Sequence, residues 1–207
     1  PAGNIIGRKA GSTPGLPAIA MGSHTDTVPN GGKYDGALGV VSAIECVQAL
    51  ADGNVTLRHP VETVVFTNEE GTRFHRWLIG SRGMAGLLEP ADLTAVDDEG
   101  VHLSARMADI GGDLSRIGEA ARKPEELAAY FELHIEQGPT LLQSGTHIGV
   151  VTGITGRAVL EVEVRGAANH AGTTPMPARH DALVSASRLV LAVHQLAAEL
   201  ETCRVAT

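Results

Sequence analysis

Apolar residues in the first third of the chain fall into short runs that polar loops separate. Residues 18–21 form an apolar run between turn residues and predict a strand covered on both faces. Residues 61–67 are rich in β-branched side chains and predict a second interior strand. Between them, apolar positions at three- and four-residue steps over 38–51 predict an amphipathic helix ending at 52–54. This order of strand, helix and strand predicts a βαβ unit and an α/β fold.

The pattern is weaker outside this unit. Residues 1–17 predict a loop or a short edge hairpin. Short helical segments are predicted over 80–88, 101–110 and from 125–129. Residues 130–135 then alternate between apolar and polar, which predicts a strand whose polar face carries His134.

The composition changes after residues 149–153. Residues 156–166 alternate as a half-exposed antiparallel strand does, and 181–201 carry the apolar spacing of a long helix. A polar loop over 169–179 joins the two. We therefore expect a first domain over 1–152 and the beginning of a second, α+β domain over 153–207.

Composition and charge limit the classes of partner. The 207 residues are 43% hydrophobic, as in ordinary globular proteins, and the net charge of −8 with no basic run argues against nucleic acid or an anionic membrane. No apolar run is long enough to cross a bilayer and no signal peptide is recognisable, so a cytoplasmic protein is expected. Cys46 and Cys203 are interpreted as ordinary buried or half-buried thiols.

Candidate chemistry follows the two predicted interior strands. His24 and Asp26 come directly after the first strand, with Asp35 in the loop that leads into the helix. Open α/β sheets bind ligands at this end of their strands, and imidazole with carboxylate favours a divalent ion such as zinc or manganese. The alternative is an exposed loop with one incidental histidine.

Glu69 and Glu70 follow the second strand. Neighbouring side chains point in different directions, so one carboxylate can bind a metal while the other takes a proton from an attacking water. A solvated acidic pair is the alternative, but His24, Asp35 and His134 on polar flanks favour the metal site. His170 lies in a loop of small residues, where it is either a ligand contact or a turn residue.

Six stretches together resemble the hydantoinase/carbamoylase amidases, dinuclear metallohydrolases related to the M20 metallopeptidases. They are Gly22-Ser-His-Thr-Asp-Thr-Val-Pro29, Gly31-Gly-Lys-Tyr-Asp-Gly-Ala-Leu-Gly-Val40, Asn68-Glu-Glu-Gly-Thr-Arg-Phe74, Gly80-Ser-Arg82, His134-Ile-Glu-Gln-Gly138 and His170-Ala-Gly-Thr-Thr-Pro-Met176. The family includes N-carbamoyl-L-amino-acid hydrolase, β-ureidopropionase and allantoate amidohydrolase. The resemblance implies an M20-type catalytic domain followed by the start of an α+β lid and dimerisation domain.

The resemblance also implies a role for each matching residue. Two divalent ions are expected, zinc first with manganese, cobalt or nickel open. The implied metal ligands are His24 on one ion, Asp35 bridging both, and Glu70 with His134 on the other. The implied catalytic residues are Asp26, which orients His24, and Glu69, the general base that passes a proton to the leaving nitrogen.

The implied substrate contacts are Gln137 near the metals and Asn169 with His170 on the lid. His170 is expected to donate a hydrogen bond to the oxyanion, in this family usually at the active site of the other subunit of a homodimer. The substrate implied is a small N-carbamoyl amino acid or ureido compound.

The alternatives that stay open are allantoate hydrolysis, an M20 deacylase or aminopeptidase, and an inactive binding or scaffold fragment. Deacylases usually carry a carboxylate where His134 stands. Family members are considerably longer, so the resemblance implies a fragment that is itself inactive. A further histidine ligand and a carboxylate-binding arginine are then expected beyond Thr207.

Overall fold

The computed structural model describes residues 1–200, and the chain forms two compact units. The first unit is Pro1–Gln143, and the second begins at Ser144. The predicted domain boundary at residue 152 stays a prediction. In the described residues, no helix combines the length and the apolar character needed to cross a membrane.

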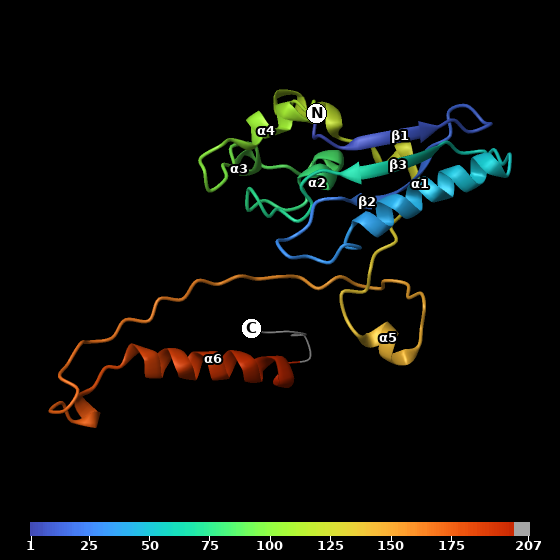
Figure 1. Cartoon of the computed structure of the whole chain (residues 1–207). Helices are drawn as coiled ribbons and strands as arrows, with labels where there is room; N and C mark the ends of the chain where they lie inside the picture. The colour runs from blue at the N-terminus through green and yellow to red at the C-terminus, as the bar shows by residue number, and fades with distance from the viewer. Residues whose placement is uncertain (201–207) are drawn as a thin grey trace. The chain divides into compact units, whose positions relative to one another are not determined.

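A four-stranded mixed sheet organises the first unit. Its strands are β1 (Ile5–Lys9), β2 (Ala18–His24), β3 (Val61–Phe66) and β4 (Leu127–Phe131), in the order β1-β3-β2-β4. β2 runs parallel to β3 and to β4, whereas β1 pairs with β3 antiparallel at one edge (Figure 1). His24 pairs with Phe66, so β2 and β3 end at the same edge of the sheet.

The predicted βαβ unit is confirmed. α1 (Ala37–Asp52) connects β2 to β3 and lies along both strands (Figure 1). The N–H of Gly53 bonds to Ala49 O at the end of the helix, where the sequence predicted it. The predicted apolar stripe is only partly correct, because Val40 is buried but Ile44 is 54% exposed. Cys46 is exposed as well, so the prediction of a buried or half-buried thiol was wrong.

Short helices follow β3, in the part of the unit that contains an apolar cluster. They are α2 (Ile79–Ala85), α3 (Pro90–Leu93), α4 (Leu103–Asp109), η1 (Leu114–Ala120) and η2 (Pro124–Glu126). The cluster contains Phe74, Ile79, Ala95, Leu103, Met107 and Leu114. A smaller cluster of Ala20, Val64 and Met84 connects the sheet to α2.

The predictions for residues 125–135 need correction. A 3-10 turn occupies Pro124–Glu126, and the strand is Leu127–Phe131 rather than 130–135. β4 pairs with β2 over Ala18–Met21, and these backbone hydrogen bonds set its limits. Side-chain alternation continues past Phe131 without a strand, and His134 therefore lies in the segment that follows β4.

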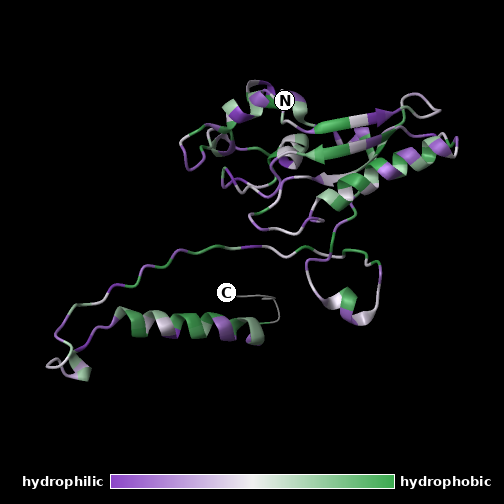
Figure 2. Cartoon of the chain, in the orientation of Figure 1, coloured by the Kyte–Doolittle hydropathy of each residue, from purple (hydrophilic) through white to green (hydrophobic). Residues whose placement is uncertain are grey.

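The second unit contains η3 (Met176–Ala178) and α6 (Ala182–Glu199), while α5 (Thr140–Ser144) spans the junction between the units. Asp181 begins α6 by accepting hydrogen bonds from the N–H groups of Leu183 and Val184. Apolar residues recur along this helix (Figure 2), and Leu183 and Val190 are largely exposed. The predicted end of the helix at Glu201 and the predicted thiol of Cys203 lie outside the described residues.

The strand predicted over residues 156–166 does not form. A strand needs a neighbour to satisfy its backbone N–H and C=O groups, and none of the described residues of the second unit supplies one. The alternating pattern therefore gives an extended segment without a ladder.

Candidate metal centre

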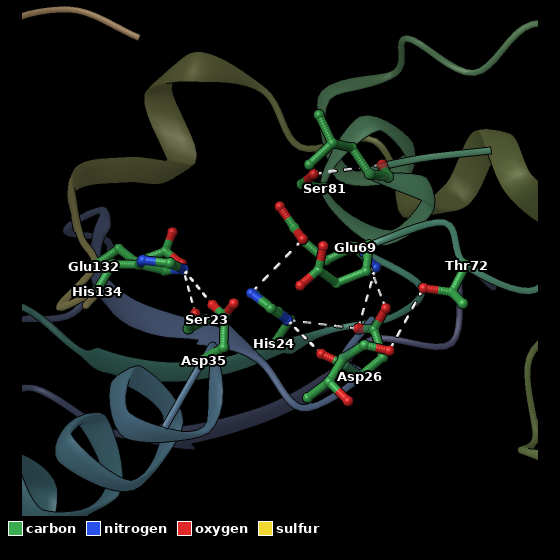
Figure 3. Close-up of polar contacts among 12 residues, drawn as sticks. Ser23, His24, Asp26, Asp35, Glu69, Thr72, Ser81, Glu132 and His134 are labelled. Atoms are coloured by element: carbon green, nitrogen blue, oxygen red, sulfur yellow. Dashed lines mark hydrogen bonds and ion pairs between the residues drawn. The ribbon is translucent and has the colours of Figure 1, made fainter. Parts of the chain in front are cut away.

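Three connections after the parallel strands bring the candidate side chains together. His24 ends β2, Glu69 and Glu70 follow β3, and His134 follows β4. Asp35 lies in the loop just before α1, and His24, Asp35, Glu69 and His134 gather at the carboxyl ends of the strands (Figure 3). Glu70 lies in one group with His24 and Glu69. Parallel pairing explains this arrangement, because it directs the loops after β2, β3 and β4 toward one edge.

The two histidines present the same ring nitrogen to the site. Nδ1 of His24 lies 2.8 Å from Asp26 O, and Nδ1 of His134 lies 2.8 Å from Ile135 O. A carbonyl oxygen only accepts, so each Nδ1 carries a proton and each neutral ring keeps its lone pair on Nε2. The ring centroids are 5.9 Å apart. Both imidazoles are thus prepared to bind a metal through Nε2.

Asp35 is 7% exposed and has two unlike oxygens. Oδ2 accepts a hydrogen bond of 2.8 Å from Gln137 Nε2. Oδ1 is buried without a hydrogen bond and lies 3.2 Å from Nε2 of His134. Two acceptors so close together repel unless a cation or a proton lies between them. This unsatisfied pair is the observation that fits a divalent ion.

A tight loop follows His24. Gly36 has a φ of +63°, and a Cβ at this position would lie 2.4 Å from Nδ1 of His24. Only glycine avoids this clash and adopts the conformation without strain. The small residue therefore allows the loop that carries Asp35 to close over the buried imidazole.

Asp26 connects the loops after β2 and β3. Its Oδ1 accepts from the backbone N–H of Glu69 at 3.2 Å, and its Oδ2 accepts from that of Glu70 at 3.0 Å. The resemblance implied only that Asp26 orients His24. Its backbone oxygen does bind His24 Nδ1, and its carboxylate lies 3.8 Å from the same atom. The sequence did not predict that the Asp26 carboxylate would also bind the backbone N–H groups of Glu69 and Glu70. Side-chain types do not show which backbone N–H groups lie within reach of a carboxylate.

Glu69 has an environment suited to exchanging protons. Its Oε2 lies 3.6 Å from His24 Nε2, and the side chain is 30% exposed. Burial raises the pKa of Glu69; His24 opposes this shift, while the negative charges of Glu70, Asp26 and Glu132 add to it. A carboxylate with a raised pKa accepts a proton more readily than one in water.

The ligand atoms form two groups, each within 4.8 Å. One contains His24, Asp35 and His134, and the other contains His24, Glu69 and Glu70. In the division implied by the resemblance, Glu70 accompanies His134 and Asp35 is shared between ions. Each predicted ligand belongs to one of the two groups, but neither group contains both Glu70 and His134, and the assignment of each ligand to an ion stays a prediction. Nitrogen and oxygen donors without thiolate suit zinc or manganese.

Glu132 is a neighbour of the centre that the sequence did not identify. Its carboxylate accepts from Ser23 Oγ at 2.6 Å and from Tyr130 Oη at 2.8 Å (Figure 3 draws the Ser23 contact). Burial and this carboxylate together raise the pKa of Tyr130 well above its usual value. These contacts attach the segment before His134 to β2. The only sequence signal was alternation, which placed Glu132 and His134 on one side.

The predicted substrate residues are divided between the units. Gln137 lies in the first unit and contacts Asp35. Asn169 and His170 lie in the second, so their contribution to the metal centre stays a prediction. Nδ1 of His170 accepts from the N–H groups of Gly172 at 3.0 Å and Thr173 at 3.2 Å. In its neutral form His170 therefore carries the proton on Nε2, the reverse of His24 and His134.

Comparisons with known proteins found a family model and several relatives that match this chain. The model of peptidase family M20/M25/M40 matches residues 20–206. An N-carbamoyl-L-amino acid amidohydrolase of Geobacillus stearothermophilus is 45% identical over 94% of this chain and 47% of its own length. A ureidoglycolate hydrolase of Arabidopsis thaliana is 43% identical over 97% of this chain and 43% of its own.

A solved structure gives the same result. The crystal structure of a hydantoinase/carbamoylase family amidase from Burkholderia ambifaria superposes with a TM-score of 0.76 at 36% identity. The match covers 96% of this chain and 48% of that one. The chain thus spans about half the length of the curated relatives it matches.

Proposed function

The chain belongs to peptidase family M20/M25/M40, and we propose that the protein carrying it hydrolyses linear amide or ureido C–N bonds, with N-carbamoyl-L-amino acids as substrates. One observation carries the proposal: the buried Oδ1 of Asp35 faces Nε2 of His134 at 3.2 Å without a hydrogen bond. A buried carboxylate oxygen that faces a ring nitrogen without a hydrogen bond is stabilised when a divalent cation binds both atoms.

The residues that would hold the metal are His24, Asp35, Glu70 and His134. Bound divalent ions supply Lewis acidity, which polarises a substrate carbonyl and lowers the pKa of water. His24 and His134 contribute Nε2, because their Nδ1 protons are already donated to backbone carbonyls. Zinc is proposed first, with manganese, cobalt or nickel compatible with the same donors.

Glu69 is proposed as the general base and acid. It takes a proton from the attacking water as the oxygen bonds to the carbonyl carbon, and it gives that proton to the nitrogen as the C–N bond breaks. Asp26 supports this role because it holds the backbone N–H groups of Glu69 and Glu70. The raised pKa of Glu69 favours the first transfer, in which the carboxylate accepts the proton.

The relatives support the substrate class. N-carbamoyl amino acids and ureidoglycolate, named for two relatives, both carry an –NH–CO–NH2 group. His170 is proposed to stabilise the oxygen that gains negative charge, and its Nε2–H tautomer makes it a donor for that purpose. Asn169 and Gln137 are proposed as further substrate contacts. We also propose a homodimer in the cytoplasm, in which His170 serves the active site of the other subunit.

The test uses the complete protein that carries this sequence, loaded with Zn²⁺ or Mn²⁺. Ammonia release from N-carbamoyl-L-amino acids and from allantoate is compared with acetate release from N-acetyl amino acids. We expect turnover of the carbamoyl compounds, and turnover lower by about 100-fold or more in the Glu69→Gln variant. Hydrolysis restricted to N-acetyl compounds would assign a deacylase instead. No turnover at full metal occupancy would favour an inactive scaffold.

A further inference from the structure

Backbone hydrogen bonds close the base of the loop that carries Glu69. This loop leads from the end of β3 into α2. The N–H of Gly80 bonds to Thr67 O at 2.8 Å, and the N–H of Leu78 bonds to Glu69 O at 2.9 Å. In an antiparallel ladder, a pair such as Thr67 and Gly80 would exchange two hydrogen bonds, but here the N–H of Thr67 donates elsewhere.

The side-chain amide of Asn4 completes this connection. Its Oδ1 accepts from the N–H of Thr67 at 3.1 Å, and its Nδ2 donates to Gly80 O at 2.8 Å. Asparagine carries an acceptor and a donor on one short planar group, so a single side chain can bridge an N–H and a C=O. Asn4 therefore joins the residue before the loop to the first turn of α2, although it lies 63 and 76 positions away from them.

The backbone around Asn4 is arranged for this close contact. A Cβ at Gly80 would lie 2.1 Å from Asn4 Oδ1 and 2.5 Å from Thr67 N, so only glycine leaves room for the amide. The ladder between β1 and β3 ends at the pair Ile5 and Val65. Asn4 and Thr67 lie just beyond this pair, where the side chain of Asn4 continues the connection that the ladder no longer makes.

We propose that Asn4 is a positioning residue for Glu69, the general base of the proposed function. The Asp26 carboxylate holds the N–H groups of Glu69 and Glu70 beside the metal centre, and Asn4 holds the two ends of the same loop. The two imidazole ligands follow other strands, so loss of Asn4 displaces the base more than it displaces them. This inference rests on the proposed function and adds a residue that acts on the base through its loop.

The first measurement is amide hydrogen exchange of the complete protein without substrate. Asn4→Asp keeps the size of the side chain and the acceptor for Thr67, but it turns an oxygen toward Gly80 O. Asn54→Asp is the matched control, because Asn54 is exposed after α1 and its left-handed backbone suits aspartate. We expect the amides of residues 68–80 to exchange about tenfold faster in Asn4→Asp, the factor given by losing one hydrogen bond. The amides of α1, and all amides in the control, should keep their rates.

The second measurement is turnover of an N-carbamoyl-L-amino acid. Asn4→Asp should lower kcat by about tenfold, less than a full 1 Å displacement of the base would, since Asp26 still holds the loop. KM should not change, because the proposed substrate contacts lie in other segments. In the Glu69→Gln background, Asn4→Asp should lower kcat by less than about twofold, because the base through which it acts is already absent. A role in folding alone would lower kcat by the same factor in both backgrounds.

Asn4→Ala is the second variant. It removes both hydrogen bonds without adding a charge, so it should give the same pattern even if the aspartate variant unfolds. Unchanged exchange over the loop, or equal losses of kcat with and without the Glu69 carboxylate, would overturn the proposal. Absence of hydrolysis by the unmodified protein would instead refute the proposed function, and the exchange rates would still decide whether Asn4 holds the loop.

Discussion

Replacing Asp26 by asparagine should separate the folding role of this carboxylate from its role in the site. The carboxylate accepts the N–H groups of Glu69 and Glu70 on its two oxygens. Asparagine keeps one oxygen and turns an NH2 group toward the other N–H, so one hydrogen bond is lost and two donors face each other. A hydrogen bond to a charged acceptor contributes about 1.5–3 kcal/mol, and the 33% exposure of the side chain favours the lower end.

We therefore expect Asp26→Asn to lower the free energy of unfolding by about 1.5 kcal/mol, measured by urea titration. Glu69 would lose its fixed backbone, and a displacement near 1 Å reduces turnover by about 100-fold. The assay is ammonia release by the complete protein at full metal occupancy. Asp98→Asn is the control, because Asp98 lies 88% exposed beside His75. Unchanged stability together with unchanged turnover would refute the role assigned to these two hydrogen bonds.

Three further changes test the remaining assignments. Glu69→Gln should keep the metal content but lower turnover by about 100-fold or more, and metal loss equal to the activity loss would make Glu69 a ligand. Asp35→Ala should remove both ions because it deletes the carboxylate that bridges them, and elemental analysis that finds one full equivalent retained would contradict this. Mixing inactive Glu69→Gln and His170→Ala proteins should restore activity if a dimer joins an intact base to an intact lid; confirmed subunit exchange without recovery would exclude that arrangement.

The local pattern was sufficient to predict the βαβ unit. Apolar runs identified β2 and β3, and a helical period identified α1, because each of these elements buries a regular set of its own side chains. Their parallel order also predicted that His24 and the acidic pair after β3 would meet. That much of the site follows from periodicity and from chain direction.

Hydrogen bonds between residues far apart in the sequence could not be predicted in this way. Glu132 bonds to Ser23 across 109 positions, and Gln137 bonds to Asp35 across 102. Hydrophobic periodicity describes how one segment faces the core, and it contains nothing about which remote polar group a side chain meets. The limits of β4 were misplaced for a related reason, since pairing with β2 determines them and alternation does not.

The backbone decides what each histidine does. His24 and His134 donate Nδ1–H to carbonyl oxygens, which leaves a lone pair on Nε2 for a metal. His170 accepts two N–H groups on Nδ1, which leaves a proton on Nε2 for an acceptor oxygen. The ring nitrogen that is left for a ligand or an acceptor thus depends on whether the neighbouring backbone offers C=O or N–H, and the roles proposed for these histidines follow that difference. Gly172 and Thr173 supply the N–H groups that bind His170 Nδ1. The loop around a histidine therefore determines which ring nitrogen is protonated in its neutral form.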